Sequence, residues 1–230
     1  MLETMSNPHK RPPVAVLGTG QVGQAIARRA RELGRAVSVG ARSAGSTSLA
    51  VFADDPGIAT GSFADAVDSA PLVVNATNGV NSLDVLTAVG ADRLAGKVVL
   101  DVANELVPVE DGGFPVPTAS AHRSLGQRLQ AAFPRTHIVK ALNTMNNQIM
   151  VRPELIAGDH LAFICGDDAD AKVVVGDLLR EFGWRDAQLM DLGGIDAAAA
   201  TEMMMSIWMR VTMARGHEAP RFNWSVLSAP

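Results

Sequence analysis

Residues 14–23 read VAVLGTGQVG and carry the strongest indication of the fold class. The first four residues form a continuous apolar run, which is typical of a parallel strand buried on both faces of a sheet. Gly18, Gly20 and Gly23 then stand in the G-x-G-x-x-G pattern. Apolar side chains recur three and four apart over residues 22–33, as in an amphipathic helix. A strand, a glycine turn and a helix in this order predict a dinucleotide-binding unit, because such a turn cradles a pyrophosphate at the start of the helix.

The downstream sequence alternates between strand and helix patterns. The expected strands are 36–40, 58–61, 72–75, 97–102, 137–142, 160–165 and 188–191. The expected helices are 63–68, 82–91, 125–133 and 169–182, and residues 107–118 are expected to form a loop rich in Gly and Pro. This alternation predicts an α/β fold, a Rossmann-type, doubly wound, mainly parallel sheet followed by a short C-terminal helical segment.

The composition favours a small molecule as the partner. The 230 residues are 47% hydrophobic and carry a net charge of −4, which leaves no basic footprint for nucleic acid or for an anionic membrane surface. One cysteine excludes an intrachain disulfide, and the first residues lack the apolar core of a signal peptide, so we expect a cytoplasmic protein. The absence of tyrosine excludes the short-chain dehydrogenases and the aldo-keto reductases. No H-E-x-x-H spacing occurs, and we expect no metal site.

Each glycine of the turn has a separate predicted role. Gly18 permits the tight turn, Gly20 lets the pyrophosphate approach the backbone, and Gly23 lets the helix pack closely on the sheet. The alternative is a plain glycine turn between a strand and a helix. The predicted cofactor contacts of this segment also include the residues between and beside the glycines, Thr19, Gln21 and Val22.

The end of the second strand predicts which dinucleotide binds. NAD-binding proteins usually place Asp or Glu there, about 20 residues after the glycines, to accept the ribose hydroxyls. Residues 39–43 read VGARS and contain no acid. Gly40 is expected to leave room for a 2′-phosphate, Arg42 to grip it through charge-assisted hydrogen bonds, and Ser43 to serve as a secondary donor. These features favour NADP(H), the alternative being that Arg42 is only a solvated strand-end arginine.

Short, uncharged side chains follow the later strands, at the edge where the nicotinamide would lie. The predicted contacts there are Asn75, Ala76, Thr77, Asn104, Asn143 and Met145. Amide and hydroxyl groups suit ribose and carboxamide recognition, although Asn and Thr at strand ends can also only satisfy turn backbones. None of these side chains is a credible general acid or base, so no catalytic residue is assigned, and we expect Lys140 to be structural.

A site without an acid or a base suits transfer between two redox cofactors. Hydride transfer to an alcohol or imine normally needs a positioned proton donor, whereas transfer between two rings needs chiefly alignment and a dry pocket. The sequence therefore predicts a small-molecule redox substrate that is itself a cofactor.

Five segments together resemble one known family. They are 16–20 with Gly23, 39–42, 140–145 (KALNTM), 166–168 (GDD) and 221–224 (RFNW). They look like the NADPH-dependent reductases of the deazaflavin coenzyme F-420 and their relatives, with a likeness that spans most of residues 14–227.

The resemblance implies a function and a cofactor arrangement. In that family a serine and one or two basic residues after the second strand hold the 2′-phosphate, and the second redox ring lies over the nicotinamide in a cleft completed by the C-terminal helix. Thr19 and Arg42 match that pattern, whereas Ala41 stands where the family often has Ser, and no second base occurs through Ser48. Related members act with flavin or ferric iron.

The implied organisation has three parts. Residues 1–12 are expected to be a disordered lead, 13–195 the NADP-binding Rossmann domain, and 196–230 a C-terminal helix and tail that complete the cleft. The helix is rich in Met, which suits a flat-ring pocket, core packing or a homodimer contact. Trp208 and Trp224 are candidates for stacking on a ring.

These expectations converge on one function, with alternatives. We expect an NADPH-dependent oxidoreductase that transfers hydride between NADPH and coenzyme F-420 or a related flavin-like acceptor. The alternatives are a catalytically silent NADP-binding sensor or subunit, and a flavin or ferric reductase.

Overall fold

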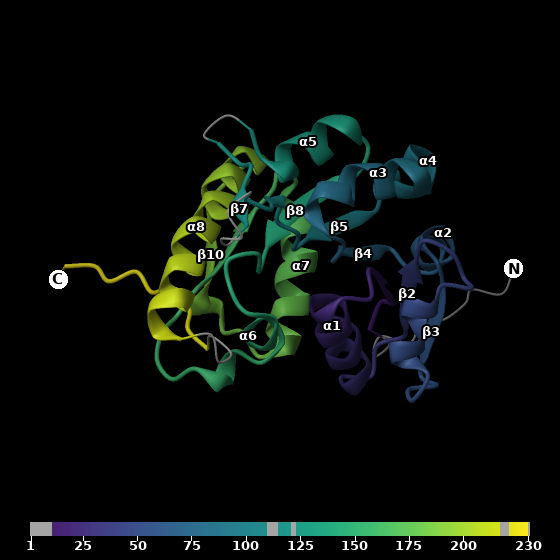
Figure 1. Ribbon diagram of the computed structural model, residues 1–230, viewed down its shortest axis with the longest axis horizontal. Helices are drawn as coiled ribbons and strands as arrows, with labels where there is room; N and C mark the ends of the chain where they lie inside the picture. The colour runs from purple at the N-terminus through teal and green to yellow at the C-terminus, as the bar shows by residue number, and fades with distance from the viewer. Residues whose placement is uncertain (1–10, 110–114, 121–122, 217–220, 230) are drawn as a thin grey trace, which may run out of the picture.

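The computed structural model describes residues 11–109, 115–120, 123–216 and 221–229. Over these residues, eight strands form one sheet in the order β10-β9-β8-β5-β4-β1-β2-β3 (Figure 1). Their bounds are β1 Val14–Leu17, β2 Val37–Ala41, β3 Ile58–Ser62, β4 Leu72–Asn75, β5 Val98–Asp101, β8 His137–Ala141, β9 Ala162–Cys165 and β10 Leu189–Asp191. Neighbouring strands pair in parallel except β8 and β9, which are antiparallel. The predicted α/β, mainly parallel fold is therefore confirmed.

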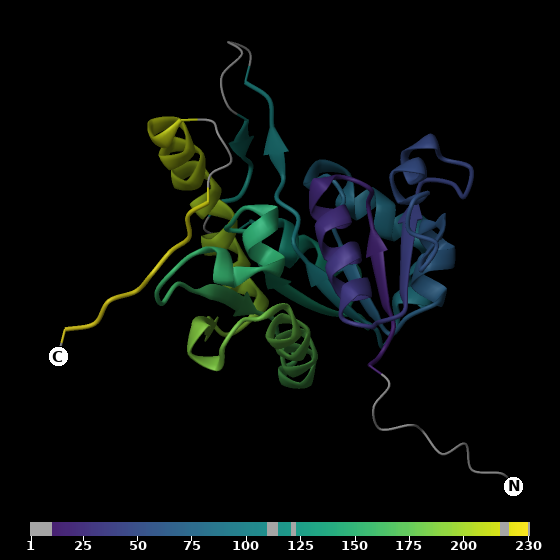
Figure 2. The same cartoon turned by 90° about the horizontal axis from the view of Figure 1, so that it is seen from below.

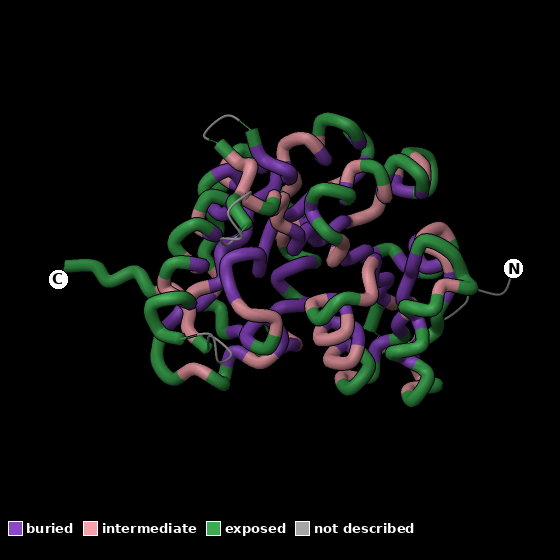
Figure 3. Tube along the Cα trace, in the orientation of Figure 1, coloured by how far each residue is buried: buried purple, intermediate pink, exposed green. Residues whose placement is uncertain are grey.

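Helices cover both faces of the sheet. Alternate side chains of β1 enter different apolar clusters, since Val14 and Val16 pack with α1 whereas Ala15 and Leu17 pack with α2 and α3. The first cluster contains α1 (Gln21–Glu32), α6 (Asn147–Val151) and α7 (Ala169–Phe182). The second contains α2 (Phe63–Asp68), α3 (Gly79–Val89), α4 (Ala91–Leu94) and α5 (Leu125–Ala132). The central strands are consequently buried, as the purple tube in Figure 3 shows.

The order of the strands creates a switch point beside β1. The chain passes from β1 to β2 on one side and returns by way of β3 to β4 on the other. Loops that leave the carboxyl ends of β1 and β4 therefore diverge, and such a crevice is where ligands bind in open α/β sheets.

Several short elements depart from the sequence prediction. Helix α3 begins at Gly79, before the expected residue 82, because the Asn78 side chain caps it by accepting a hydrogen bond from Val80 N across 3.3 Å. The expected loop 107–118 overlaps an antiparallel pair, β6 (Leu106–Val107) and β7 (Val116–Pro117), and its residues 110–114 lie outside the described part. Helix α6 was not expected, because five residues carry too little periodicity to be recognised.

The C-terminal segment consists of α8 (Ala198–Arg215) and a tail. Figure 2 shows α8, in yellow-green, at the end of the molecule opposite the N-terminal strands. The tail returns to the fold, because Leu161 N donates to Trp224 O across 2.8 Å and Trp224 Nε1 donates to Thr144 O across 3.0 Å. No helix in the described ranges has the length and apolar composition needed to cross a membrane.

The expected disordered lead lies mostly outside the described residues, which begin at residue 11. The carbonyl oxygen of Pro12 accepts a hydrogen bond from Arg35 Nη1 across 2.7 Å. The Arg11 guanidinium lies 3.4 Å from the Glu181 carboxylate.

Candidate functional site

The turn between β1 and α1 has the geometry that a pyrophosphate requires. Gly18 has φ +116°, and a Cβ atom there would lie 2.5 Å from Ala76 O. A Cβ atom on Gly23 would lie 2.1 Å from Gly18 O, so both positions must be glycine. A Cβ atom on Gly20 would meet nothing within 4 Å. The backbone at Gly20 therefore faces open space, where a phosphate can approach it.

The start of α1 adds a favourable electrostatic environment. Its N-cap, Gly20, provides no side-chain cap, and its first turn contains no acidic residue. The Gln24 side chain fixes the loop by donating to Thr19 O across 2.9 Å. The unsatisfied N–H groups and the positive end of this helix suit an anion.

A first pocket, of about 440 Å³, opens beside this turn. Its walls come from the loops after β1, β2 and β4, and they include Gly18, Thr19, Gly20, Arg42, Ser46, Ser48, Ala76 and Thr77. Arg42 is exposed, and no hydrogen bond or ion pair engages its guanidinium within the described part of the chain. Ser46 and Ser48 stand beside it, their hydroxyls 2.9 Å apart. This end of the pocket therefore presents the Arg42 guanidinium and two serine hydroxyls, which together can bind a phosphate.

Two expectations for this end differ from the structure in detail. Ser43 is exposed but does not line the pocket, and its carbonyl instead accepts from Ser46 N. The expectation that Gly40 leaves room for a phosphate is wrong, because a Cβ atom there would lie 2.9 Å from Phe63 Cα. Close packing of α2 on β2 is what requires glycine at this position.

A second pocket, of about 640 Å³, continues from the first. The two share Ala76, Thr77 and Asn78, and together we call them the groove. The second pocket is lined by Val22, Gly79, Val80, Val102, Ala103, Asn104, Leu106, Pro108, Pro115 and Met150 in addition to the shared residues. None of these lining residues is charged, so this half of the groove suits a flat, uncharged ring.

The predicted strand-end residues fall into two layers. Ala76, Thr77 and Asn104 line the groove. Asn75 is fully buried behind it, where its Nδ2 donates to Asp101 Oδ1 across 2.8 Å and its Oδ1 accepts from Thr77 Oγ1 across 2.7 Å.

The residues after β8 also lie behind the groove wall. Asn143 is buried, and its Nδ2 donates to Asn104 Oδ1 across 3.0 Å. Met145 is only 5% exposed and belongs to the hydrophobic core. In the turn, Val22 lines the groove, whereas Gln21 is exposed at the start of α1 and Gly23 packs against Gly18, and neither lines the groove.

Gly79 is a position that the sequence prediction missed. A Cβ atom there would lie 2.1 Å from Asn104 O, so the start of α3 packs directly against the loop after β5. Its signal in the sequence was a glycine directly after the strand-end segment 75–78, which is also typical of an ordinary turn.

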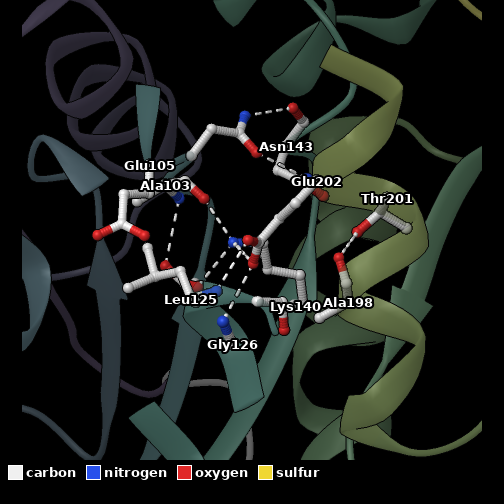
Figure 4. Close-up of polar contacts among 12 residues, drawn as sticks. Ala103, Glu105, Leu125, Gly126, Lys140, Asn143, Ala198, Thr201 and Glu202 are labelled. Carbon is white, nitrogen blue, oxygen red and sulfur yellow. Dashed lines mark hydrogen bonds and ion pairs between the residues drawn. The ribbon is translucent and has the colours of Figure 1, made fainter. Parts of the chain in front are cut away.

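Figure 4 shows a buried polar cluster around Lys140, which contacts Ala103 of the groove wall. Lys140 Nζ lies 2.8 Å from Asp101 Oδ2 and 2.9 Å from Glu202 Oε1, and it also donates to Ala103 O. Burial lowers the pKa of Lys140, but the Asp101 and Glu202 carboxylates outweigh it and raise that pKa above its ordinary value. The lysine is therefore charged at neutral pH. The expected structural role of Lys140 agrees with this position, whereas the role of Glu202 was missed.

Three further titratable side chains of the described residues, those of His137, His160 and Cys165, do not line the groove. His137 Nδ1 lies 3.1 Å from Asp168 Oδ2, and His160 Nε2 lies 3.1 Å from Pro153 O. Burial raises the pKa of the Cys165 thiol to about 12, so this thiol stays protonated. Within the described ranges, no group of three or more His, Cys, Asp or Glu side chains could hold a metal ion.

The two tryptophans proposed for ring stacking already have aromatic partners. Trp208 stacks on Phe222 with ring centroids 5.7 Å apart, and Trp224 meets the edge of the same ring at 5.9 Å. The Trp208 ring therefore packs the tail against α8, and the Trp224 indole holds the tail against Thr144.

Comparisons with known proteins show what the chain as a whole is similar to. The sequence profile of the family described as NADP oxidoreductase coenzyme F420-dependent matches residues 13–105. A crystal structure described as a candidate F420-dependent NADP reductase, from Arthrobacter sp. FB24, is 38% identical, and the match covers 95% of this chain and 100% of that chain with a TM-score of 0.87.

Two other proteins are less similar to this chain in sequence. The metalloreductase STEAP3 of Rattus norvegicus is 29% identical over 197 residues, which are 85% of this chain but only 36% of the length of that relative. A pyrroline carboxylate reductase structure from Plasmodium falciparum is 13% identical, with 90% of this chain and 68% of that chain covered and a TM-score of 0.54, and it shows the fold alone. On the glycine turn, the groove and the likeness to the Arthrobacter protein over its whole length, the chain belongs to the family of coenzyme F420-dependent NADP oxidoreductases and is an NADP(H)-binding oxidoreductase.

Proposed function

We propose that this enzyme transfers hydride between NADP(H) and coenzyme F-420 or a closely related flat-ring acceptor. The observation that carries the proposal is the groove, which has a cation and two hydroxyls at one end and an uncharged wall at the other. A wall without acidic or basic side chains suits two stacked rings, because it excludes water and offers no side chain that could exchange a proton with the substrate.

The residues present fit NADP(H). Open space at Gly20 and the start of α1 would receive the pyrophosphate, and Arg42 with Ser46 and Ser48 would hold the 2′-phosphate. Thr77, Asn78 and Asn104 are the polar residues that line the opposite half, and of these Thr77 and Asn104 would bind ribose or carboxamide. Bound NADPH supplies a hydride, that is, two electrons and one proton.

The protein itself contributes alignment and exclusion of water. Val22 of α1 and Met150 of α6 line the second pocket, together with Leu106 of β6 and Pro108, which follows it. No lining side chain in this half is an acid or a base, so the second proton needed to complete reduction of the acceptor would come from solvent.

The test is the oxidation of NADPH with different acceptors. We expect fast turnover with coenzyme F-420, slower turnover with riboflavin derivatives, and none with a cyclic imine. Turnover with the imine alone would contradict the proposal, because an imine reductase needs a proton donor.

A flavin or ferric reductase is the second candidate, and the likeness to a metalloreductase favours it. Oxidation of NADPH by FMN or by a ferric chelate, at a rate above that with coenzyme F-420, would support this candidate over the first. A saturable site for the acceptor on the NADP-bound protein would exclude a silent sensor.

A further inference from the structure

Lys140 is a buried cation whose three N–H donors are all used. They meet Asp101 Oδ2 at 2.8 Å, Glu202 Oε1 at 2.9 Å and the carbonyl oxygen of Ala103. The side chains of Lys140 and Asp101 are 0% exposed, and that of Glu202 is 2% exposed. An ammonium with three fixed acceptors and no access to water has no freedom to reorient.

This cluster holds the groove wall at two points. Both polar atoms of Ala103 are engaged, since its carbonyl accepts from Lys140 and its N–H donates to Asp101 Oδ1 across 3.2 Å. The second route runs from Asp101 through Asn75 to the hydroxyl of Thr77, over contacts of 2.8 and 2.7 Å. Ala103 and Thr77 both line the second pocket of the groove.

Glu202 connects the same cluster to the C-terminal helix. It belongs to α8, and its two carboxylate oxygens accept from Leu125 N and Gly126 N, at 2.8 and 3.0 Å, at the start of α5 (Figure 4). The two helices are in close contact, because a Cβ atom on Gly126 would lie 2.9 Å from the Cβ of Ala198. The position of the Lys140 ammonium therefore depends on how α8 is seated.

Stability alone is a weak reason for burying three charges under a ligand groove. The cost of removing ions from water offsets much of their mutual attraction, and buried ion clusters can often be replaced by apolar residues without loss of stability. We propose that Lys140 and Glu202 are positioning residues, which hold Ala103 and Thr77 in place for the nicotinamide half of NADP(H) and make that alignment depend on the seating of α8.

The experiment compares two ligand probes on the Glu202→Gln variant. The amide introduced by this substitution cannot accept from Lys140 and from both N–H groups of α5 as a carboxylate does, so the cluster loses at least one contact. We expect the affinity for 2′,5′-ADP to stay within about twofold, because it would bind mainly to the turn at Gly20 and to Arg42, Ser46 and Ser48, none of which contacts the cluster. Loss of one charge-assisted contact is expected to weaken NADPH binding about tenfold and to abolish the change in nicotinamide fluorescence on binding.

The matched control is Glu181→Gln. Glu181 also bonds a buried cation, with its Oε2 2.7 Å from Arg35 Nε, but its contacts with Arg35 and Arg11 lie outside the groove. This variant is expected to lose stability while both probes bind as before. Neither readout needs an acceptor, so the result is independent of which acceptor the enzyme uses.

Two outcomes would overturn the proposal. Equal weakening of both probes would assign the cluster a merely structural role, and unchanged nicotinamide fluorescence would remove the link to the groove. If Glu202→Gln does not fold, Asn75→Leu leaves all three contacts of Lys140 in place and cuts only the route to Thr77. The Asn75→Leu variant must then reduce the change in nicotinamide fluorescence without changing the affinity for 2′,5′-ADP, and any other result overturns the proposal.

Discussion

Gly23 approaches Gly18 so closely that a Cβ atom on Gly23 would lie 2.1 Å from the carbonyl oxygen of Gly18. Gly20, between them, has open space where its side chain would be. Substitution at Gly20 is therefore expected to affect ligand binding, whereas substitution at Gly23 is expected to affect stability. Gly20→Val is expected to abolish NADPH binding in a folded protein, because the new side chain occupies the space of the pyrophosphate. Gly23→Ala is expected to lower the thermal midpoint instead, since backbone must move. Nucleotide titration and thermal melts separate the two, and unchanged affinity in folded Gly20→Val would contradict the placement of the pyrophosphate.

Arg42 is expected to decide the preference for NADPH over NADH. A charge-assisted contact with a phosphate contributes about 1.5–3 kcal/mol, which is roughly ten- to a hundredfold in affinity. Arg42→Ala should remove most of that preference, and titration of both nucleotides measures it. Arg180→Ala is the control, because Arg180 pairs with Asp177 and Asp186 on α7 and the following turn, outside the groove. Equal affinities of the unsubstituted protein for NADPH and NADH would show that Arg42 does not contact a 2′-phosphate.

Neither histidine in the described ranges is expected to act as the catalytic acid. His137 is paired with Asp168 and His160 with Pro153 O, and neither lines the groove. Turnover of His137→Ala and His160→Ala should stay within about a hundredfold of the unsubstituted enzyme, the low end of what general acid-base catalysis contributes. Deuteration at one of the two C4 positions of NADPH should slow turnover while deuteration at the other does not. Complete loss of activity in a folded histidine variant that still binds both ligands would show that the reaction needs acid catalysis by that histidine, and that alignment of the two rings is not sufficient.

The lowered pKa of Glu105 predicts that the protein loses stability at acid pH. Burial, the largest effect, raises its pKa, but hydrogen bonds from Thr118 and Arg128 outweigh it and lower that pKa below its ordinary value of 4.5. A carboxyl whose pKa is lowered by folding contributes stability above its unfolded pKa, and the contribution is lost as the pH falls through the folded pKa. Part of the fall in unfolding free energy below pH 4.5 should therefore be absent in Glu105→Gln. Urea denaturation at several pH values measures it, and parallel curves for the two proteins would refute the assignment.

The exposed face of α8 is expected to form a homodimer contact. Met203 is 39% exposed and Ile207 is 49% exposed, one helical turn apart, on a helix whose other face is buried. Apolar side chains grouped in this way mark interaction surfaces. Ile207→Glu should convert a dimer into a monomer in light scattering, whereas Val173→Glu, at an exposed apolar position of α7, should not. A monomeric unsubstituted protein would exclude this contact.

The first strand, the glycine turn and the helix that follows could be predicted from the amino-acid sequence, because they depend on local patterns. A buried parallel strand is a continuous apolar run, and φ +116° at Gly18 or a 2.1 Å approach at Gly23 permits only glycine. The absence of an acid at the end of β2 likewise indicated NADP(H) from five adjacent residues. Helix α6 and the β6-β7 pair escaped prediction, because segments this short carry no distinctive period.

Which strand-end residues face the groove and which support it depends on packing between distant segments, and the sequence pattern does not show it. Asn75 and Thr77 stand two positions apart in one polar segment, yet Asn75 is fully buried and Thr77 lines the pocket. The pairing of Lys140 with Glu202 joins β8 to a helix far along the chain. No local pattern encodes such a pair, because two buried charges find each other only when the packing of α8 on α5 brings them to the same place.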